Sequence, residues 1–110
     1  MALYQFKSII SNNIGTSATD VYTVPTAKKS IIIGCSIANI TRGNLPAEVK
    51  LVKADSTEIH LALSTKIKGG TTTDFLAGKK LVMEAGDKIN ITGKVANGLD
   101  CVLSVLEDVD

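Results

Sequence analysis

The stretch GKKLVMEAGDKINI, Gly78–Ile91, decides the fold prediction. Its apolar run Leu81–Met83 precedes the short polar segment Glu84–Asp87, and isoleucine then alternates with polar residues over 88–91. Alternation with a period of two predicts strands that have one buried face. Gly86 is the position where a positive φ costs least. We therefore expect a strand, a tight turn and a second strand, forming a corner of a β-sandwich.

The two acidic residues of this turn, Glu84 and Asp87, are the first candidates for acid–base chemistry. Acidic residues are common in tight turns because they form local hydrogen bonds, so we expect them to shape the turn. The turn is similar to a glycine-aspartate turn of cupin barrels, but metal-dependent cupins need several histidines, and His60 is the only one here. His60 lies between Ile59 and Leu61 on an expected strand, with no partner for Ser-His-Asp catalysis. We expect no enzymatic activity.

Composition predicts a single all-β domain with an aliphatic core. A chain of 110 residues is the size of one domain. Aromatic residues make up only 4% and tryptophan is absent, so Ile, Val and Leu must fill the core. Branched side chains favour strands. The net charge of +1, with lysine pairs only at Lys28–Lys29 and Lys79–Lys80, does not predict nucleic-acid binding.

The two cysteines, Cys35 and Cys101, both lie inside apolar runs. Free, buried thiols that pack as small apolar groups are the favoured interpretation. A disulfide between their two strands is the alternative, and the sequence leaves it open. Two cysteines and one histidine without metal-ligand spacing do not make a metal site, so we expect neither a metal nor another cofactor.

The N-terminal segment Met1–Ile10 holds Tyr4 and Phe6, half of the aromatic residues. It is too polar for a signal peptide, and no apolar run approaches the ~20 residues of a membrane helix, so we expect synthesis in a cytoplasm and no membrane contact. Residues 6–10 are either a strand on the protein's own core or an arm that packs on a neighbouring subunit. We expect an N-terminal arm and loop over 1–20 and a sandwich domain over 21–110.

The remaining segments read as strands separated by turns. The expected strands are 6–10, 21–24, 30–40, 46–54, 58–63, 81–83, 88–91 and 99–106, with a weak strand around Ile67. About eight strands at this spacing predict one antiparallel β-sandwich with jelly-roll or Greek-key connections.

The side-chain pattern also predicts which residues of these strands face the core. In the central strand we expect Ile31, Ile33, Cys35 and Ile37 on one face, with Gly34 marking a bulge or a close approach. In 58–63 we expect Ile59, Leu61 and Leu63 on one face, and in 99–106 Cys101, Leu103 and Val105. Residues 107–110 read as a frayed acidic tail.

Three segments together resemble small β-sandwich virion proteins of tailed bacteriophages. They are VYTVPTAKKSIIIGCSIANIT (Val21–Thr41), LAGKKLVMEAGDKINI (Leu76–Ile91) and DCVLSVLE (Asp100–Glu107). The resemblance covers most of 21–107, whereas residues 1–20 match no known pattern.

The resemblance implies a structural protein of the virion, made in the host cytoplasm. Its role would be capsid decoration (cement), or a component of the neck or tail, and it would act as a symmetric homo-oligomer, a trimer or ring, on major capsid, neck or tail proteins. We expect Leu3, Tyr4 and Phe6 to form a subunit contact, since edge strands offer unpaired backbone groups to a neighbour. The alternative is a receptor- or carbohydrate-binding module of a fibre or adhesin, for which four aromatic residues give little sugar-stacking surface.

Overall fold

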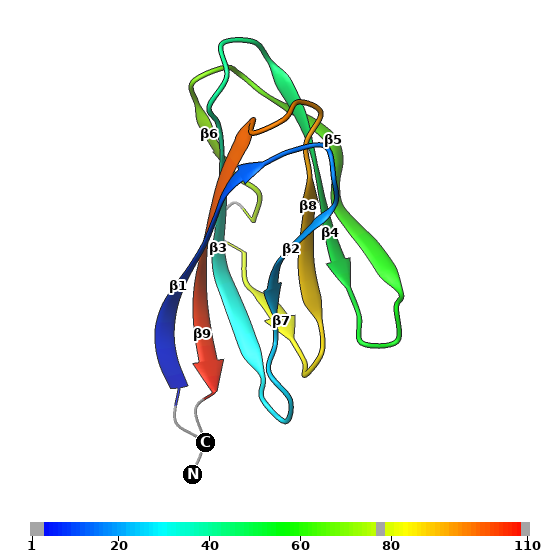
Figure 1. Ribbon diagram of the computed structural model, residues 1–110. Coiled ribbons are helices and arrows are strands. Elements are labelled where there is room, and N and C mark those ends of the chain that lie inside the picture. The colour runs from blue at the N-terminus through cyan, green and yellow to red at the C-terminus, as the bar shows by residue number, and fades with distance from the viewer. Residues whose placement is uncertain (1–3, 77–78, 109–110) are drawn as a thin grey trace.

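The computed structural model describes residues 4–76 and 79–108, which form two antiparallel sheets packed face to face (Figure 1). The strands are β1 (Tyr4–Ile14), β2 (Thr19–Thr23), β3 (Ser30–Asn39), β4 (Leu45–Val52), β5 (Glu58–Ile67), β6 (Thr72–Asp74), β7 (Leu81–Met83), β8 (Lys88–Thr92) and β9 (Leu99–Asp108). The expected all-β sandwich is confirmed. Among the described residues there is no helix, and so none that could cross a membrane.

The strand order brings distant parts of the chain together. The first sheet has the order β1-β9-β3-β6, and β7 also pairs with β3. The second sheet has the order β2-β8-β4-β5. β9 therefore lies between β1 and β3, and Figure 1 shows the blue β1 beside the red β9 along one side of the molecule.

The core between the sheets is aliphatic, as the composition predicts. Tyr22 is the one aromatic side chain among the described residues that is fully buried. The largest completely buried side chains are Ile14, Ile32, Ile37, Ile67, Met83, Ile89, Ile91, Leu99, Leu103, Val24, Val49 and Val105. Each such side chain stabilises the fold by about 1.5–3 kcal/mol relative to an exposed position. Burial of aliphatic faces from both sheets is therefore the main force that holds them together.

The segment between β7 and β8 is a corner between the two sheets. β7 pairs with β3 in the first sheet, whereas β8 pairs with β2 and β4 in the second. Gly86 has a φ of +85°, as the sequence predicts, and a Cβ atom there would lie 3.0 Å from the Cβ of Ala54. Glycine is therefore required both by backbone conformation and by space.

The prediction of which β3 side chains face the core is wrong for the first half of the strand. Ile32 is completely buried, whereas Ile31 and Ile33 are only half-buried. The register with β9 shifts between Ile32 and Gly34, so the bulge expected at Gly34 exists. A bulge adds one residue to a strand and reverses which side chains face the core. The expected pattern holds only after the bulge, where Cys35 and Ile37 are buried.

Two other expectations about strand limits are wrong. Residues 11–20 were expected to form a loop, but β1 continues to Ile14 and β2 begins at Thr19. The described part of the expected N-terminal arm is therefore an edge strand of the first sheet, paired with β9. The expected frayed tail is also wrong at Glu107, which lies in β9 with a buried side chain.

In β5 only Leu61 of the expected apolar face packs against the core. Ile59 and Leu63 are 49% and 66% exposed. The pairing of β5 with β4 shifts register twice, between Ala47 and Val49 and between Val49 and Lys50. The hairpin that joins these two strands is confirmed, but its shifts break the simple alternation.

Candidate functional site

Asp87 at the corner between β7 and β8 stabilises the turn. Its carboxylate accepts hydrogen bonds from Lys53 Nζ at 2.6 Å, the Glu84 N–H at 2.9 Å and the Ala54 N–H at 3.2 Å. Burial alone would raise the pKa of Asp87, but these three donors outweigh it and lower the pKa. The side chain is 1% exposed and remains charged because its oxygens are fully engaged.

An open depression of about 270 Å³ lies beside this corner. Its lining residues are Lys53, Ala54, Asp55, Glu84, Ala85 and Asp87. Asp55 accepts a hydrogen bond from the Thr57 N–H, and this bond lowers the pKa of Asp55. A general acid at neutral pH needs a raised pKa, so neither Asp55 nor Asp87 suits that task. The carboxylates of Asp87 and Asp55 thus shape their turns, as expected for Asp87, whereas the Glu84 carboxylate is exposed and contacts Lys53 at 3.4 Å.

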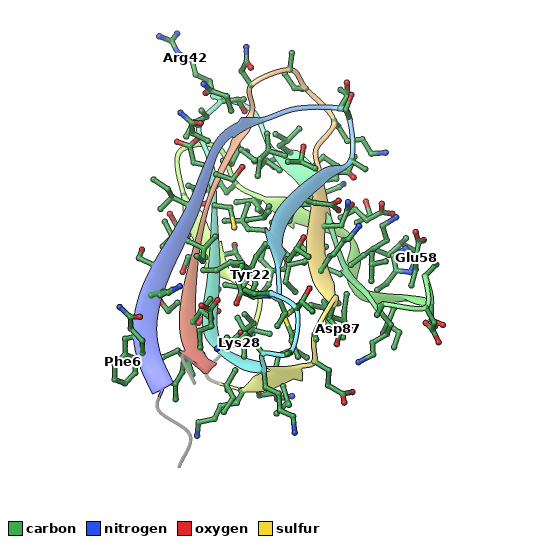
Figure 2. The ribbon with its side chains drawn as sticks, turned by 60° about the horizontal axis from the view of Figure 1, so that its bottom comes forward. Phe6, Tyr22, Lys28, Arg42, Glu58 and Asp87 are labelled. Atoms are coloured by element: carbon green, nitrogen blue, oxygen red, sulfur yellow. The ribbon has the colours of Figure 1, made fainter. Side chains whose placement is uncertain are left out.

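A buried polar network joins β1, β2, β3 and β9 near one end of the sandwich. Lys7 Nζ lies 2.6 Å from Glu107 Oε1, and the Tyr22 hydroxyl donates to Glu107 Oε2 at 2.6 Å. The Ser30 hydroxyl lies 2.6 Å from the Tyr22 oxygen. Because the single phenolic proton goes to Glu107, Ser30 must be the donor to Tyr22. Figure 2 shows Tyr22 inside the molecule, between the sheets.

The network changes the pKa values of its members in opposite directions. The hydrogen bonds from Lys7 and then Tyr22 lower the pKa of Glu107. Burial, followed by the hydrogen bond to Glu107, raises the pKa of Tyr22 to about 12. Glu107 is therefore a charged acceptor and Tyr22 a neutral donor, an arrangement that stabilises the fold and leaves no group free for proton transfer.

Cys35 and Cys101 lie on the neighbouring strands β3 and β9 and are both free. Cys35 pairs with Leu103 and Cys101 pairs with Ile37, so the two cysteines are diagonal neighbours on the core face. A hydrogen bond with the Cys101 thiol, and then burial, raises the pKa of Cys35. Nucleophilic cysteines need a lowered pKa, so the favoured interpretation of these thiols as buried apolar groups is confirmed.

The outer face of the second sheet is polar. Asp20, Asn90, Lys50 and His60 face one another across β2, β8, β4 and β5. Ion pairs join Lys50 to Glu58 at 3.3 Å and Lys88 to Asp20 at 3.6 Å, and His60 Nε2 lies 3.5 Å from Glu48 Oε2. His60 is therefore a surface residue, as expected. Within residues 4–76 and 79–108, no three His, Cys, Asp or Glu side chains gather in a group that could hold a metal ion.

The outer face of the first sheet exposes large apolar side chains among small polar ones. Phe6, Leu106, Ile31 and Val82 face one another across β1, β9, β3 and β7. Facing residues in a sheet project from the same side, so these four side chains form one row. Phe6 is 74% and Val82 64% exposed.

A second pair extends this row along the strands. Ile10 on β1 faces Val102 on β9, and they are 74% and 43% exposed. The small residues Ser8 and Ser104 separate the pair from the first row. We call this surface, made by Phe6, Ile10, Ile31, Val82, Val102 and Leu106, the apolar outer face.

The structure describes both backbone and side chain for only one of the three predicted contact residues. Phe6 lies on the apolar outer face, and Figure 2 shows its ring projecting from the side of the molecule. Tyr4 begins β1, but only its backbone is described, and Leu3 lies outside the described residues. Sequence reasoning missed Ile10, Val82 and Val102. Their shared face depends on strand register, for which the sequence offers only the alternation of β1 as a signal.

Comparison with models of known protein families found no match, and comparison with curated proteins found none either. Among solved structures, a Bacillus endospore appendage protein, described as forming a novel family of disulfide-linked pili, is similar with a TM-score of 0.60 and 9% identity. The match covers 98% of this chain and 89% of that chain.

Two weaker likenesses have TM-scores below 0.5. A chain of infectious bursal disease virus, Gx strain, has a TM-score of 0.49 and 12% identity, over 96% of this chain and 32% of that one. The nucleoplasmin-like N-terminal domain of Drosophila FKBP39 has a TM-score of 0.47 and 17% identity, over 100% and 93%. At these identities the comparisons establish the β-sandwich fold, on the strength of the endospore protein, and the fold alone.

Proposed function

We propose that this protein is a non-enzymatic structural component of a tailed-bacteriophage virion, which assembles as a symmetric oligomer as a capsid decoration protein or as part of the neck or tail. The observation that carries the proposal is the difference between the two outer faces of the sandwich. The outer face of the second sheet carries charged side chains in contact with one another, and that of the first sheet exposes aromatic and aliphatic side chains.

The apolar outer face suits a surface that is covered in an assembly. Single exposed apolar residues are ordinary on monomeric proteins, but contiguous apolar patches mark interaction sites. Here the exposed residues Phe6, Ile10, Val82 and Val102 belong to three strands of one sheet face. Burying one large apolar side chain contributes about 1.5–3 kcal/mol, so a few of them suffice to hold a subunit in place.

The chemistry of the polar groups also supports a structural role. Three buried polar groups have a shifted pKa, namely Asp87, Glu107 and Tyr22. Each of them forms hydrogen bonds with partners inside the fold. Groups of this kind stabilise a domain, whereas catalytic groups must reach a substrate. The resemblance to phage virion proteins over 21–107 points to the same class.

The likeness to the endospore appendage protein is compatible with an assembly role, since that protein forms pili. Those pili are described as disulfide-linked. In this chain Cys35 and Cys101 are 2% and 1% exposed, so contacts between folded subunits would be noncovalent.

The test is co-sedimentation with purified particles of the phage whose genome encodes the chain. We expect near-stoichiometric binding per capsid or tail subunit, and weaker binding of the variant Val82→Glu, which places a charge on the apolar outer face. The matched control is Val95→Glu, at a loop position that is 48% exposed. Wild-type protein that stays in the supernatant, or equal binding by both variants, contradicts the proposal.

A further inference from the structure

We propose that two copies of this chain pair through β1, edge to edge and antiparallel, around a twofold axis that passes beside Ser8. This inference deepens the proposed function because it names one contact of the oligomer, and its test does not require the virion.

Three of the described edges are protected against pairing with another chain. β6 and β7 are three residues each, too short for a stable ladder. β2 has five residues, its register shifts between Asp20 and Tyr22, and Pro25 follows shortly after its end. Short strands, register shifts and prolines are the usual devices that prevent edge-to-edge association.

The fourth edge, β5, is long but irregular. It has ten residues and exposes Ile59 and Leu63. Its pairing with β4 shifts register twice, and Glu58, His60 and Lys66 place polar or charged groups along it. Bulges twist an edge away from a flat partner, so β5 is a poor template.

β1 is the described edge with the longest regular stretch, because its register with β9 shifts only between Ser11 and Ile14. It is eleven residues long and pairs with β9 without a register shift from Tyr4 to Ser11. It contains no proline, and its single charged residue, Lys7, is neutralised by Glu107 of the same chain at 2.6 Å. In Figure 1 this strand lies at the outside of its sheet, with no other strand beyond it. An exposed, regular edge of this length is a template for a further strand.

Symmetry restricts the possible registers. A twofold axis perpendicular to a sheet keeps each side chain on its own face, so the axis must pass beside a single residue that faces its own copy. With Ser8 at the axis, Phe6 of each copy faces Ile10 of the other. Both side chains are 74% exposed in one chain, and the pairing buries them against each other. The small Ser8 residues fit at the centre.

The polar residues of β1 select the same register. With Ser8 at the axis, Lys7 faces Ile9 of the second copy and Gln5 faces Ser11. An axis beside Lys7 would place the two Lys7 ammonium groups opposite each other, and like charges directly opposite are destabilising. An axis beside Ile9 would place Phe6 opposite Asn12. Of these three registers, only the Ser8 register places an apolar residue opposite Phe6 and keeps the two Lys7 ammonium groups apart.

The size of the contact predicts its strength. Residues 5–11 of each copy would form seven facing pairs, a ladder of about 23 Å at 3.3 Å per residue. One ladder buries less than the roughly 800 Å² per partner of a standard stable interface, so the free dimer is a transient one. Many copies on one particle would strengthen such a contact through high effective concentration.

Cysteine cross-linking tests the register directly. In either kind of antiparallel facing pair the Cα atoms lie about 4.5–5.5 Å apart, within the range of a disulfide. Ser8→Cys should therefore form a disulfide-linked dimer rapidly under mild oxidation. The matched control is Ser104→Cys, at the position of β9 that faces Ser8. Two copies of residue 104 would lie three strand spacings apart, about 14 Å, and should not cross-link. Cross-linking of Ser8→Cys that is no faster than that of Ser104→Cys overturns the proposal.

Charged substitutions separate this inference from the proposed function. In the Ser8→Cys background, Phe6→Glu or Ile10→Glu should slow cross-linking at least tenfold, because glutamates then face apolar side chains across the axis. Val82→Glu, on the far edge of the same sheet, should leave the rate unchanged, and circular dichroism confirms that each variant is folded. An equal effect of all three substitutions contradicts β1 pairing.

Rapid cross-linking without particle binding would overturn the virion role alone, and particle binding without cross-linking would overturn β1 pairing alone.

Discussion

Glu107 accepts hydrogen bonds from Lys7 and Tyr22, each at 2.6 Å, and so ties the neighbouring strands β1 and β9 of the first sheet to β2 of the second sheet. Lys7 lies on β1, Glu107 on β9 and Tyr22 on β2. A buried carboxylate without partners is strongly destabilising, but a carboxylate with two donors is stabilised. This one side chain therefore makes the positions of three strands depend on one another.

Tyr22→Phe should destabilise the protein by about 1.5–3 kcal/mol, because it removes a hydrogen bond to a charged group and leaves the Ser30 hydroxyl without its acceptor. Urea denaturation measures the change. A double-mutant cycle with Glu107→Gln should give a coupling energy of at least about 0.5 kcal/mol. Additive effects would mean that Tyr22 acts through packing only.

Tyr22 should ionise with a pKa of about 12 in the folded protein. The folded pKa of Tyr22 lies above its unfolded value of about 10. The contribution of Tyr22 to the free energy of unfolding is therefore complete below pH 10 and is lost as pH rises toward 12. Ultraviolet titration of a Tyr4→Phe variant, in which Tyr22 is the only tyrosine, measures this. Ionisation with a pKa near 10 in the folded variant would disprove the buried donor.

Stability should fall in acid through Asp87 and Glu107. Their folded pKa values lie below the ordinary values of 3.8 and 4.5. The contribution of these two carboxylates to the free energy of unfolding is therefore complete above their unfolded pKa values. It is lost as pH falls through their lower folded pKa values. Urea midpoints between pH 7 and pH 3 should show the decline, and Glu107→Gln should make it shallower. The control Glu84→Gln, at an exposed side chain, should keep the wild-type slope.

Gly86→Ala should destabilise the corner by at least about 1 kcal/mol. The residue adopts a φ of +85°, which costs roughly 1–2 kcal/mol for a residue with a Cβ atom, and that atom would lie 3.0 Å from the Cβ of Ala54. Gly43→Ala is the control, since a Cβ atom there meets nothing within 4 Å. Thermal unfolding of both variants would measure the difference, and equal melting temperatures would refute the strained-turn argument.

Cys35 and Cys101 should resist thiol reagents in the folded protein and react rapidly after unfolding, because both are buried and burial helps to raise the pKa of Cys35. Mass spectrometry with and without reductant should find the same mass. A mass lower by two hydrogen atoms without reductant would instead identify a disulfide between β3 and β9.

The sequence predicted the features that follow from residue type. The aliphatic core follows from the scarcity of aromatic residues, and the corner at Gly86 follows from the need for a positive φ. The face of β9 was also right, since Cys101, Leu103 and Val105 are all buried. Each of these depends on local composition or on an uninterrupted alternation.

The sequence did not predict the features that depend on partner strands. The register shift between Ile32 and Gly34 reverses which side chains of β3 face the core. Its position is set by the pairing with β9, which the sequence of β3 does not show. The burial of Glu107 depends on Lys7, one hundred residues away in the chain. Of the apolar outer face, Phe6 was anticipated, but Val82 joins it only through its pairing with Ile31.

The position of β9 between β1 and β3 has a consequence for biosynthesis. β1 is synthesised before its partner in the sheet, β9, which is the last strand that the structure describes. The first sheet therefore cannot close before β9 has been synthesised, and until then the edges of β1 and β3 that pair with β9 have unpaired backbone groups. Such long-range pairing is slow and exposes the chain to aggregation. Chaperones are thus expected to bind this chain before β9 takes its place in the sheet.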